Sequence, residues 1–265
     1  MFQYARQPVT LCFQASLAAL AMLFFSGCTT PRASRAAWTN SLGMPFQPVP
    51  VGNQAILVAQ TETQEKHLDR FRGKQTGAPD APAAWVSWTE AVAFCDWLTR
   101  AERASGHISS RHRYRLPTDH EWSCAAGIGP MERPVGTPES KSGRIPGHFP
   151  WGSSWPPPRG AGNLCGTESR HAFPDNHIHT YRDGFCDGAL KTRASRPNAH
   201  GLYDLGGNVW EWCQDLFRPG TNWRVLRGGS WKSARPGTLL SSHRTHDPEG
   251  YRSDSVGFRC VLVEE

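Results

Sequence analysis

The sequence predicts a loop-rich α+β fold with little regular secondary structure, and three observations lead to that prediction. The 265 residues include 11 Trp, 26 Gly and 21 Pro but few long apolar runs, so aromatic packing has to compensate for sparse helices and strands. Two segments carry the residue pattern of a helix-capping box. The C-terminal part, after residue 163, alternates short strand patterns with glycine turns.

The first 27 residues are predicted to be an export signal. Arg6 supplies a positive charge, residues 11–25 form an apolar run, and small residues precede Cys28. This arrangement resembles a bacterial lipobox, in which Cys28 becomes the acylated first residue of the mature protein. Thr29 after the cysteine favours the outer membrane, so we expect a lipid anchor on its periplasmic face. A retained membrane anchor is the alternative, although the apolar run is short for a membrane span.

The mature chain is expected to consist of a tether, residues 28–40, and a folded domain, residues 41–265. Loss of residues 1–27 removes Arg6 and no acid, so the formal net charge falls from +6 to +5. Basic residues are scattered apart from a short cluster at residues 111–115. This distribution gives no support to a nucleic-acid partner.

The N-terminal half of the domain contains the clearest local structure. Residues 42–60 predict two short strands around a turn at Pro50 and Gly52, and residues 66–84, rich in charge, Gly and Pro, predict an irregular surface segment. Ser87 and Glu90 predict a capping box that opens a helix, with Gly106 as its stop. The apolar face of this helix is expected to comprise Ala91, Phe94, Cys95 and Leu98.

Further elements follow from the same reasoning. Thr118 and Glu121 form a second capping box and open a shorter helix that extends to residue 126. Residues 127–162, rich in proline and glycine, predict a long ordered loop or an insertion. Residues 224–231 predict a strand that leads into a glycine turn. Residues 257–263 predict the last strand, with Phe258, Cys260 and Leu262 on one face.

Residues 201–215 contain two acids on either side of a tight turn. Gly206 and Gly207 permit positive φ, and the strand pattern that follows places Glu211 seven positions after Asp204. Carboxylates together with main-chain carbonyls from a glycine turn suit Ca²⁺. A hairpin with two exposed acids is the alternative reading of the same spacing.

Six ordered motifs resemble the formylglycine-generating enzyme, or sulfatase-modifying factor, family, and the resemblance runs from about residue 41 to residue 263. The motifs are Arg115-Leu116-Pro117-Thr118 with Glu121-Trp122, Pro150-Trp151-Gly152, Gly201-Leu202-Tyr203, Gly207-Asn208-Val209-Trp210-Glu211-Trp212, Arg227-Gly228-Gly229-Ser230-Trp231 and Gly257-Phe258-Arg259. The resemblance implies a variant of the C-type lectin fold that is held by calcium.

The resemblance also implies two calcium sites and one cysteine pair. One ion would be held by Asp204, Gly207, Val209 and Glu211, and the other by Asn163, Leu164, Asp183 and Phe185. Cys95 and Cys260 match positions that are bridged in some members of the family. Cys165 and Cys186 each follow an expected carbonyl ligand of the same ion, so we expect a second bridge between them. The pairing of the remaining Cys124 and Cys213 stays open.

The sequence departs from the family at the positions of its catalytic cysteines. Catalytic members use two cysteines, five positions apart, to bind copper and oxidise a substrate cysteine; Ser233 and Thr238 stand there in this chain. A hydroxyl replaces neither a Cu(I)-binding thiolate nor a thiol that forms a mixed disulfide. Formylglycine generation by the family mechanism is therefore not expected, although Trp210, Ser230 and Arg244 match residues of the family's substrate cleft. A core position for Trp210 and a role of Ser230 in ending the strand are the alternatives.

Two groups of histidines could instead hold a redox metal. His177 and His179 lie near Asp175, and His243 and His246 lie near Asp247; solvated loop histidines are the alternative in both cases.

Two functions remain open at this stage. The first is a non-catalytic binding or scaffolding module, calcium-stabilised and lipid-anchored at Cys28, for a protein, peptide or glycan, including the role of a structural accessory of an envelope machine. The second is a metal-dependent oxidoreductase of the same superfamily that works without the cysteines. Convergence of the histidine groups on one site would favour the second.

Overall fold

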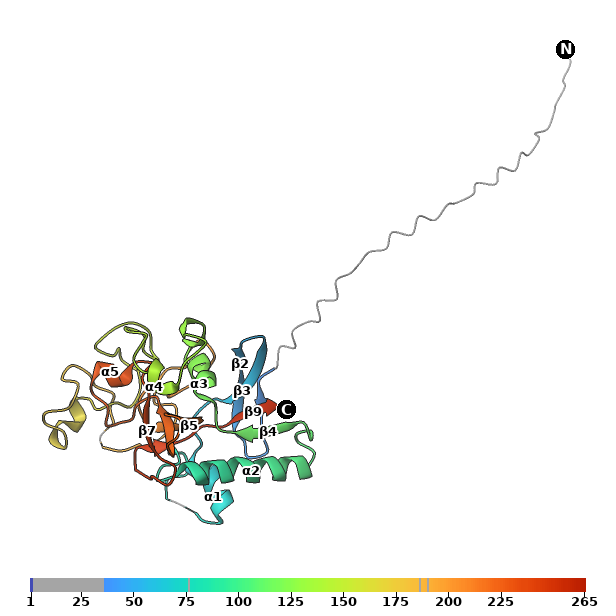
Figure 1. Ribbon diagram of the computed structural model, residues 1–265, viewed down its shortest axis with the longest axis horizontal. Coiled ribbons are helices and arrows are strands. Elements are labelled where there is room, and N and C mark those ends of the chain that lie inside the picture. Colours follow the sequence, from blue (N-terminus) through green and yellow to red (C-terminus); the bar gives the residue numbers. More distant parts are fainter. Residues whose placement is uncertain (2–35, 76, 186, 190) are drawn as a thin grey trace. The chain divides into compact units, whose positions relative to one another are not determined.

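The computed structural model describes residues 1, 36–75, 77–185, 187–189 and 191–265, and the described residues from 36 onward form one compact unit. The export signal, Cys28 and Cys186 lie outside the described residues. Among the described helices, none is both long and apolar enough to cross a membrane. The mixture of short helices and two small sheets joined by long loops confirms the predicted loop-rich α+β fold (Figure 1).

The first sheet has five strands in the order β1-β2-β3-β9-β4. Their bounds are Trp38–Thr39 (β1), Pro45–Val51 (β2), Gln54–Ala59 (β3), His112–Arg115 (β4) and Val261–Glu264 (β9). The hairpin of β2 and β3 confirms the two strands predicted over residues 42–60, and Gly52 has a φ of +57° at its turn. The last strand of the chain enters the sheet between β3 and β4, so both ends of the domain meet in one sheet.

The second sheet has four strands in the order β7-β6-β5-β8. Their bounds are Trp210–Leu216 (β5), Trp223–Arg227 (β6), Thr245–Pro248 (β7) and Val256–Gly257 (β8). The strand β8 runs parallel to β5, whereas the other pairs are antiparallel.

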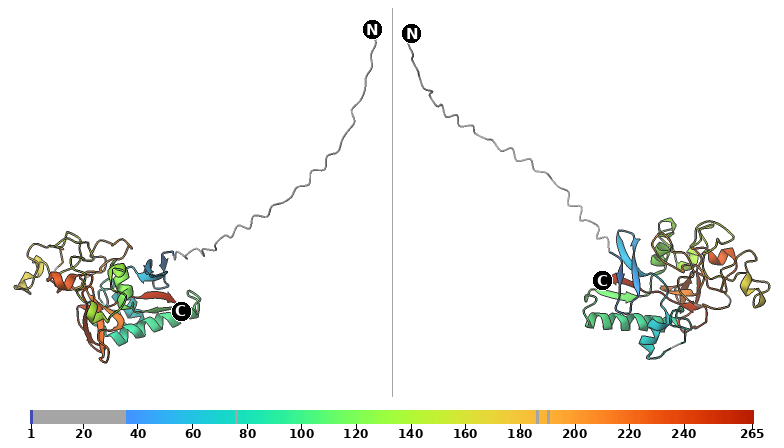
Figure 2. Two further views of the ribbon diagram at one scale, coloured as in Figure 1. Left: turned by 45° about the horizontal axis from the view of Figure 1, so that its top comes forward. Right: turned by 180° about the vertical axis from the view of Figure 1, so that it is seen from behind.

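The helices differ widely in length. Their bounds are Glu65–Arg72 (α1), Trp88–Ala104 (α2), Asp119–Ala125 (α3), Pro138–Lys141 (α4) and Pro236–Leu239 (α5), with 3₁₀ turns at Gly129–Met131 (η1) and Thr167–His171 (η2). The three views show α2 along one side of the unit, with α3 and the long loops on the other side of the first sheet (Figures 1 and 2).

Helix α2 confirms the first predicted helix. Ser87 accepts a hydrogen bond from the amide of Glu90, and the predicted apolar face, Ala91, Phe94, Cys95 and Leu98, is fully buried against the first sheet. The second half of the expected capping box is absent in the described structure, because the Glu90 carboxylate pairs with Arg72 and Arg252 instead. Helix α3 does have the complete capping box of Thr118 and Glu121.

Three predictions of local structure were wrong. Residues 65–72 form α1 rather than an irregular segment, because Gln64 and His67 cap its first turn and Leu68 anchors it in the core. The expected tether ends earlier, since Trp38 packs on Phe46, with ring centroids 5.7 Å apart, and starts β1. The last predicted strand is two strands, β8 and β9, which belong to different sheets.

Residues 258–260 connect these two strands and join the two halves of the core. Phe258, Cys260 and Leu262 lie together in the cluster between α2 and the first sheet, as their spacing predicted. Val261 and Val263 point to the opposite cluster, which contains Trp122 and the second sheet. The alternation of a strand therefore fills both cores from one short segment.

Candidate functional site

The turn that joins residues 204–211 is buried and has an unusual backbone. Asp204 and Asn208 have φ angles of +58° and +56°, and Gly207 has +85°. A Cβ atom on Gly207 would lie 2.2 Å from the carbonyl oxygen of Asn163, so only glycine fits there. The amide of Asn208 donates to that same oxygen at 2.8 Å. The turn is thus locked against the loop that carries the other expected calcium ligands.

Asp204 holds a neighbouring loop in place. It is 1% exposed, and its carboxylate accepts hydrogen bonds from the amides of Arg193 and Ser195. The Ser195 hydroxyl in turn accepts from the amide of Asp204 at 2.7 Å. Burial raises the pKa of Asp204 above its usual value. The two amides supply partial positive charge, but no cationic side chain pairs with this carboxylate in the described structure.

Glu211 is not an exposed acid of a hairpin. It is fully buried and accepts two hydrogen bonds from Arg259, at 2.7 and 2.5 Å, and one from the indole of Trp122 at 2.8 Å. The sequence contained Arg259 only as the last residue of a motif, and nothing in its position indicated this partner. A fork-to-fork pair of this kind is among the stronger charge-assisted contacts in proteins.

Glu62 is the third buried carboxyl residue beside Asp204 and Glu211, and the sequence did not indicate it. Its fully buried carboxylate accepts from the Asn208 side-chain amide at 2.9 Å and from the Val209 amide at 3.4 Å. Burial raises its pKa well above the usual value, and the charges of Asp204 and Glu211 add to that effect. Three buried carboxylates therefore face the single guanidinium of Arg259 in the described structure, and a cation is the kind of group that balances such an excess.

The other expected calcium residues also lie together. The Asp183 carboxylate accepts from the amides of Leu164 and Phe185, both at 2.8 Å, and its pKa is raised, chiefly by burial. The buried Asn163 donates through its side chain to Asn208 at 3.1 Å. The carbonyl of Leu164 accepts from the amide of Gly166, so it is engaged within its own loop.

These two groups fit a hard cation in charge and donor type, with oxygen donors only. Ca²⁺ takes six to eight oxygens from carboxylates, amides, main-chain carbonyls and water. In the described part of the chain no three His, Cys, Asp or Glu side chains are arranged to hold a metal together. The two expected sets contain two side chains and two carbonyls each, so they do not require such a group.

The positions of the family's catalytic cysteines are engaged in turns. The Ser233 hydroxyl accepts from the amide of Ser230 at 3.0 Å, and the Thr238 hydroxyl donates to the Arg235 carbonyl at 2.8 Å. Ser230 is itself 1% exposed, and its hydroxyl accepts from the amide of Lys232. These hydroxyls stabilise the backbone after the glycine turn.

The three expected cleft residues do not form one wall. Trp210 is half-buried and lies beside His243, with ring centroids 5.9 Å apart. The Arg244 side chain is instead completely buried, where it pairs with Asp119 at 2.9 Å and with Glu132 at 2.5 Å. Arg227 joins the same network through Asp119. Arg244 therefore holds α3 to the second sheet, and its assignment to a cleft was wrong.

The histidine groups do not converge. His177 and His179 touch each other, with centroids 4.2 Å apart, while His246 stacks on Trp223 at the same centroid distance. His243 lies beside the Trp210 ring, and its pKa falls to about 4 because of burial and the nearby Arg227 and Arg244 charges. Asp175 and Asp247 form no metal-holding group with these histidines in the described residues.

The expected bridge between Cys95 and Cys260 is absent in the described structure, where both are free thiols. The Sγ atoms of Cys95 and Cys260 are 3.6 Å apart, which is contact distance but longer than the ~2.05 Å of a disulfide. Cys165 donates to the Asn176 carbonyl, and its expected partner Cys186 lies outside the described residues. Cys124 and Cys213 are both buried and unbridged.

Comparison with known proteins agrees with this architecture. Residues 29–263 match the family described as sulfatase-modifying factor enzyme 1-like domain. The inactive Cα-formylglycine-generating enzyme 2 of Mus musculus is 34% identical over 189 residues, which are 69% of this chain and 49% of the relative. The formylglycine-generating enzyme of Streptomyces coelicolor is 31% identical over 208 residues, which are 72% of this chain and 55% of the relative.

This chain thus spans about half the length of these relatives. Among solved structures, PvdO from Pseudomonas aeruginosa superposes with a TM-score of 0.54 at 16% identity, over 85% of this chain and 97% of that one, which shows a common fold. The relatives include proteins named as active and as inactive enzymes, so kinship alone does not decide activity. The family match covers most of the chain, and the chain belongs to the sulfatase-modifying factor enzyme 1-like, or formylglycine-generating enzyme-like, family.

Proposed function

We propose that this protein is a non-catalytic binding or scaffolding module of its family. The observation that carries the proposal is the pair of hydroxyls, Ser233 and Thr238, at the positions of the two cysteines that catalytic members use. Both hydroxyls take part in turn hydrogen bonds, and neither can supply a thiolate. The similarity to a relative named as an inactive enzyme also supports a non-catalytic role.

Calcium is the metal that we propose for this module. Asp204, Gly207, Val209 and Glu211 would hold one ion, and Asn163, Leu164, Asp183 and Phe185 would hold the other. The three buried carboxyl groups of Glu62, Asp204 and Glu211 support the first assignment, because a cation would stabilise the charged forms that burial disfavours at Glu62 and Asp204. The ion would supply positive charge and fix two loops against each other, which is a structural rather than a chemical role.

We also propose that the module is displayed at the periplasmic face of the outer membrane through a lipid on Cys28. A protein, a peptide or a glycan of the cell envelope is the expected partner class. The support is the pattern of residues 1–29 alone. Expression of the full chain and of Cys28→Ser, followed by membrane fractionation and mass spectrometry of the N-terminus, tests it, because only the former should carry lipid.

The metal content of purified residues 32–265, measured by elemental mass spectrometry before and after mild chelation, tests the calcium and the non-catalytic role together. About two calcium ions per chain, without iron, copper or zinc, is the expected result. A stoichiometric redox metal would overturn the proposal and favour a cysteine-independent oxidoreductase. His177, His179, His243 and His246 would then be the first residues to mutate.

An activity assay provides the second test. A cysteine-containing peptide incubated with Cu(I), oxygen and residues 32–265 should yield no aldehyde, as measured by hydrazide labelling and mass spectrometry. An active formylglycine-generating relative is the positive control. Aldehyde formation by this chain would contradict the argument from Ser233 and Thr238.

A further inference from the structure

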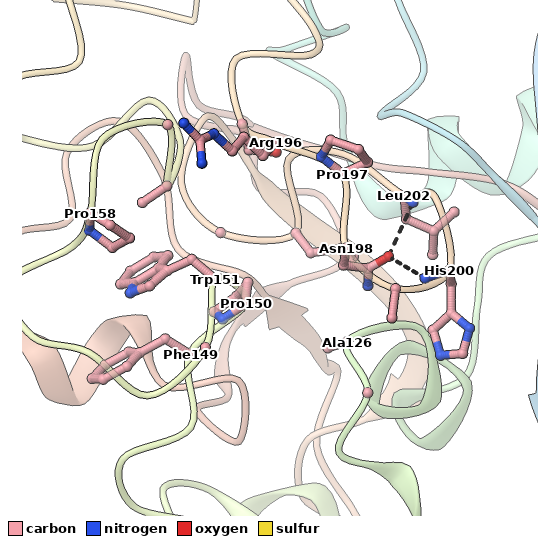
Figure 3. Close-up of a pocket in the computed structure, with 18 of the residues that line it drawn as sticks. Ala126, Phe149, Pro150, Trp151, Pro158, Arg196, Pro197, Asn198, His200 and Leu202 are labelled. Carbon is pink, nitrogen blue, oxygen red and sulfur yellow. Dashed lines mark hydrogen bonds between the residues drawn. The ribbon is translucent and has the colours of Figure 1, made fainter.

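The described structure contains a cavity whose walls include none of the expected cleft residues. It has a volume of about 460 Å³, and none of Trp210, Ser230, Ser233, Thr238 or Arg244 lines it (Figure 3). Its walls come from residues 149–152 and 158–161 of the long loop and from residues 195–202, and Leu205 and Gly206 of the buried turn also line it. A volume of this size accommodates a small molecule or one large side chain.

One wall of the cavity is a rigid aromatic surface. The rings of Phe149 and Trp151 are parallel, with an interplanar angle of 1° and centroids 5.1 Å apart, in the offset stack that aromatic pairs prefer. Figure 3 shows these two rings on one side of the cavity with Pro150 and Pro158 nearby. Proline rings and a fixed indole offer flat apolar faces at little entropic cost, which suits a planar ring of a ligand.

The charge in the cavity has one sign. Arg159 and Arg196 line it, both are exposed, and none of its lining residues within the described chain is acidic. The amide of Arg196 donates to the Gly160 carbonyl at 2.9 Å, which ties the two loops together at this rim. Gly160, at φ +85°, also leaves room for the Arg196 side chain, since a Cβ atom there would come within 3.2 Å of it. Guanidinium groups bind carboxylates through paired donors.

Asn198 and Ser195, two of the neutral polar side chains that line the cavity together with His200, are already engaged. The Asn198 side chain donates to the Ala125 carbonyl and accepts from the amides of His200 and Leu202 (Figure 3). The Ser195 hydroxyl accepts from the Asp204 amide. A sugar ring presents hydroxyls that need several free acceptors and donors, which these side chains do not offer. The cavity therefore favours a flat ring with one anionic group over a neutral glycan.

We propose that this cavity binds an aromatic carboxylate, with the ring on Trp151 and the carboxylate at Arg196 and Arg159. Either a small aryl acid or the C-terminus of a peptide that ends in an aromatic residue supplies this chemistry. The proposal goes beyond the scaffolding role, and it depends neither on calcium nor on the lipid anchor. The test of the cavity measures ligand affinity, whereas the test of the non-catalytic, calcium-holding module measures metal content. Either proposal can therefore be refuted without the other.

Isothermal titration of residues 32–265 with phenylacetate and with the neutral phenylacetamide tests the proposal. The acid should bind about tenfold more tightly than the amide, as expected for a charge-assisted hydrogen bond. Arg196→Gln should weaken that preference, because only Arg159 remains for the carboxylate, while Arg170→Gln, at an exposed arginine outside the cavity, should retain it. Equal affinity for acid and amide, or no effect of Arg196→Gln, would overturn the proposal.

Three further ligands distinguish a small aryl acid from a peptide C-terminus and test the need for an aromatic ring. Ala-Ala-Phe with a free C-terminus, compared with its amidated form, reports whether a peptide end is accepted in place of a free acid; tighter binding of the free form supports the proposal. Glucuronate has a carboxylate but no aromatic face. Binding of glucuronate as tight as that of phenylacetate would show that the ring plays no part and would refute the assignment. Melting temperatures of both variants within about 2 °C of the parent would show that their folds are intact.

Discussion

His67 makes the stability of this protein depend on pH in a way that one substitution can isolate. The residue is 4% exposed in the first turn of α1, where its Nδ1 accepts from the amide of Gln64 at 3.3 Å. Its Nε2 is buried without a hydrogen-bond partner in the described structure. Burial, aided by the charge of Lys66, lowers its pKa from 6.5 to about 4. His67→Gln keeps an acceptor at the third helical position, the usual place for Gln in a capping box, and removes the titration.

The magnitude follows from linkage between protonation and folding. A depressed pKa in the folded state contributes stability that is present above pH 6.5 and is lost as the pH falls toward 4, because the unfolded chain takes up the proton first. Between pH 7 and pH 5 the loss from this one imidazole is about 2 kcal/mol. The other histidines contribute equally to both proteins, so they cancel in the comparison.

Urea unfolding of residues 32–265 at pH 7 and at pH 5, followed by tryptophan fluorescence, measures this difference. The unfolding free energy of the parent should fall by about 2 kcal/mol more than that of His67→Gln between the two pH values. His148→Gln, at an exposed histidine, serves as the control and should behave as the parent. An identical pH dependence of His67→Gln and the parent would refute the reasoning, and so would an equal effect of the control.

Three further predictions rest on buried contacts. Arg259→Met leaves buried carboxylates without their guanidinium and should cost about 3–5 kcal/mol in urea unfolding; a loss below 1 kcal/mol would contradict the ion pair. Gly207→Ala should lower the melting temperature far more than Gly220→Ala, because both glycines have positive φ but only the former meets atoms within 4 Å; equal losses would mean that strain alone acts. Mild oxidation should remove the Cys95 and Cys260 thiols together and raise the melting temperature, as thiol titration and calorimetry would show; two thiols that persist after oxidation would rule this pair out.

Local sequence signals predicted the elements that depend on local interactions. The helix that begins after Ser87 and the hairpin of residues 42–60 carry their capping residues and apolar periods within a few positions of each other. Helix α1 was not predicted because the pair of Gln64 and His67 is a rare form of the capping box. The division of the last strand into β8 and β9 was not predicted either. The alternating side-chain pattern continues through both strands, and only their pairing with distant strands separates them.

The candidate site was predictable in its parts but not in its connections. Asp204 and Glu211 stand out beside a double glycine, and Asn163 and Asp183 emerge from the family resemblance. No local rule pairs Asn208 with Glu62, which is 146 positions earlier, or Arg259 with Glu211 across 48 positions. The same holds for Arg244, whose aligned position suggested a cleft while its partners 125 and 112 positions earlier bury it.

The burial of Arg244 bears on where the protein can bind an anion, at the surface beside Trp210 or in the cavity beside Trp151. Near Trp210, the neighbouring imidazole of His243 is neutral at pH 7, because its pKa is about 4, and the charge of Arg244 is consumed by Asp119 and Glu132. The Arg244 guanidinium is therefore not free beside Trp210, where the family resemblance had placed it. Exposed arginines instead line the cavity beside Trp151. We therefore expect an anionic ligand to bind in the cavity beside Trp151, and such binding requires no chemistry at Ser233 or Thr238.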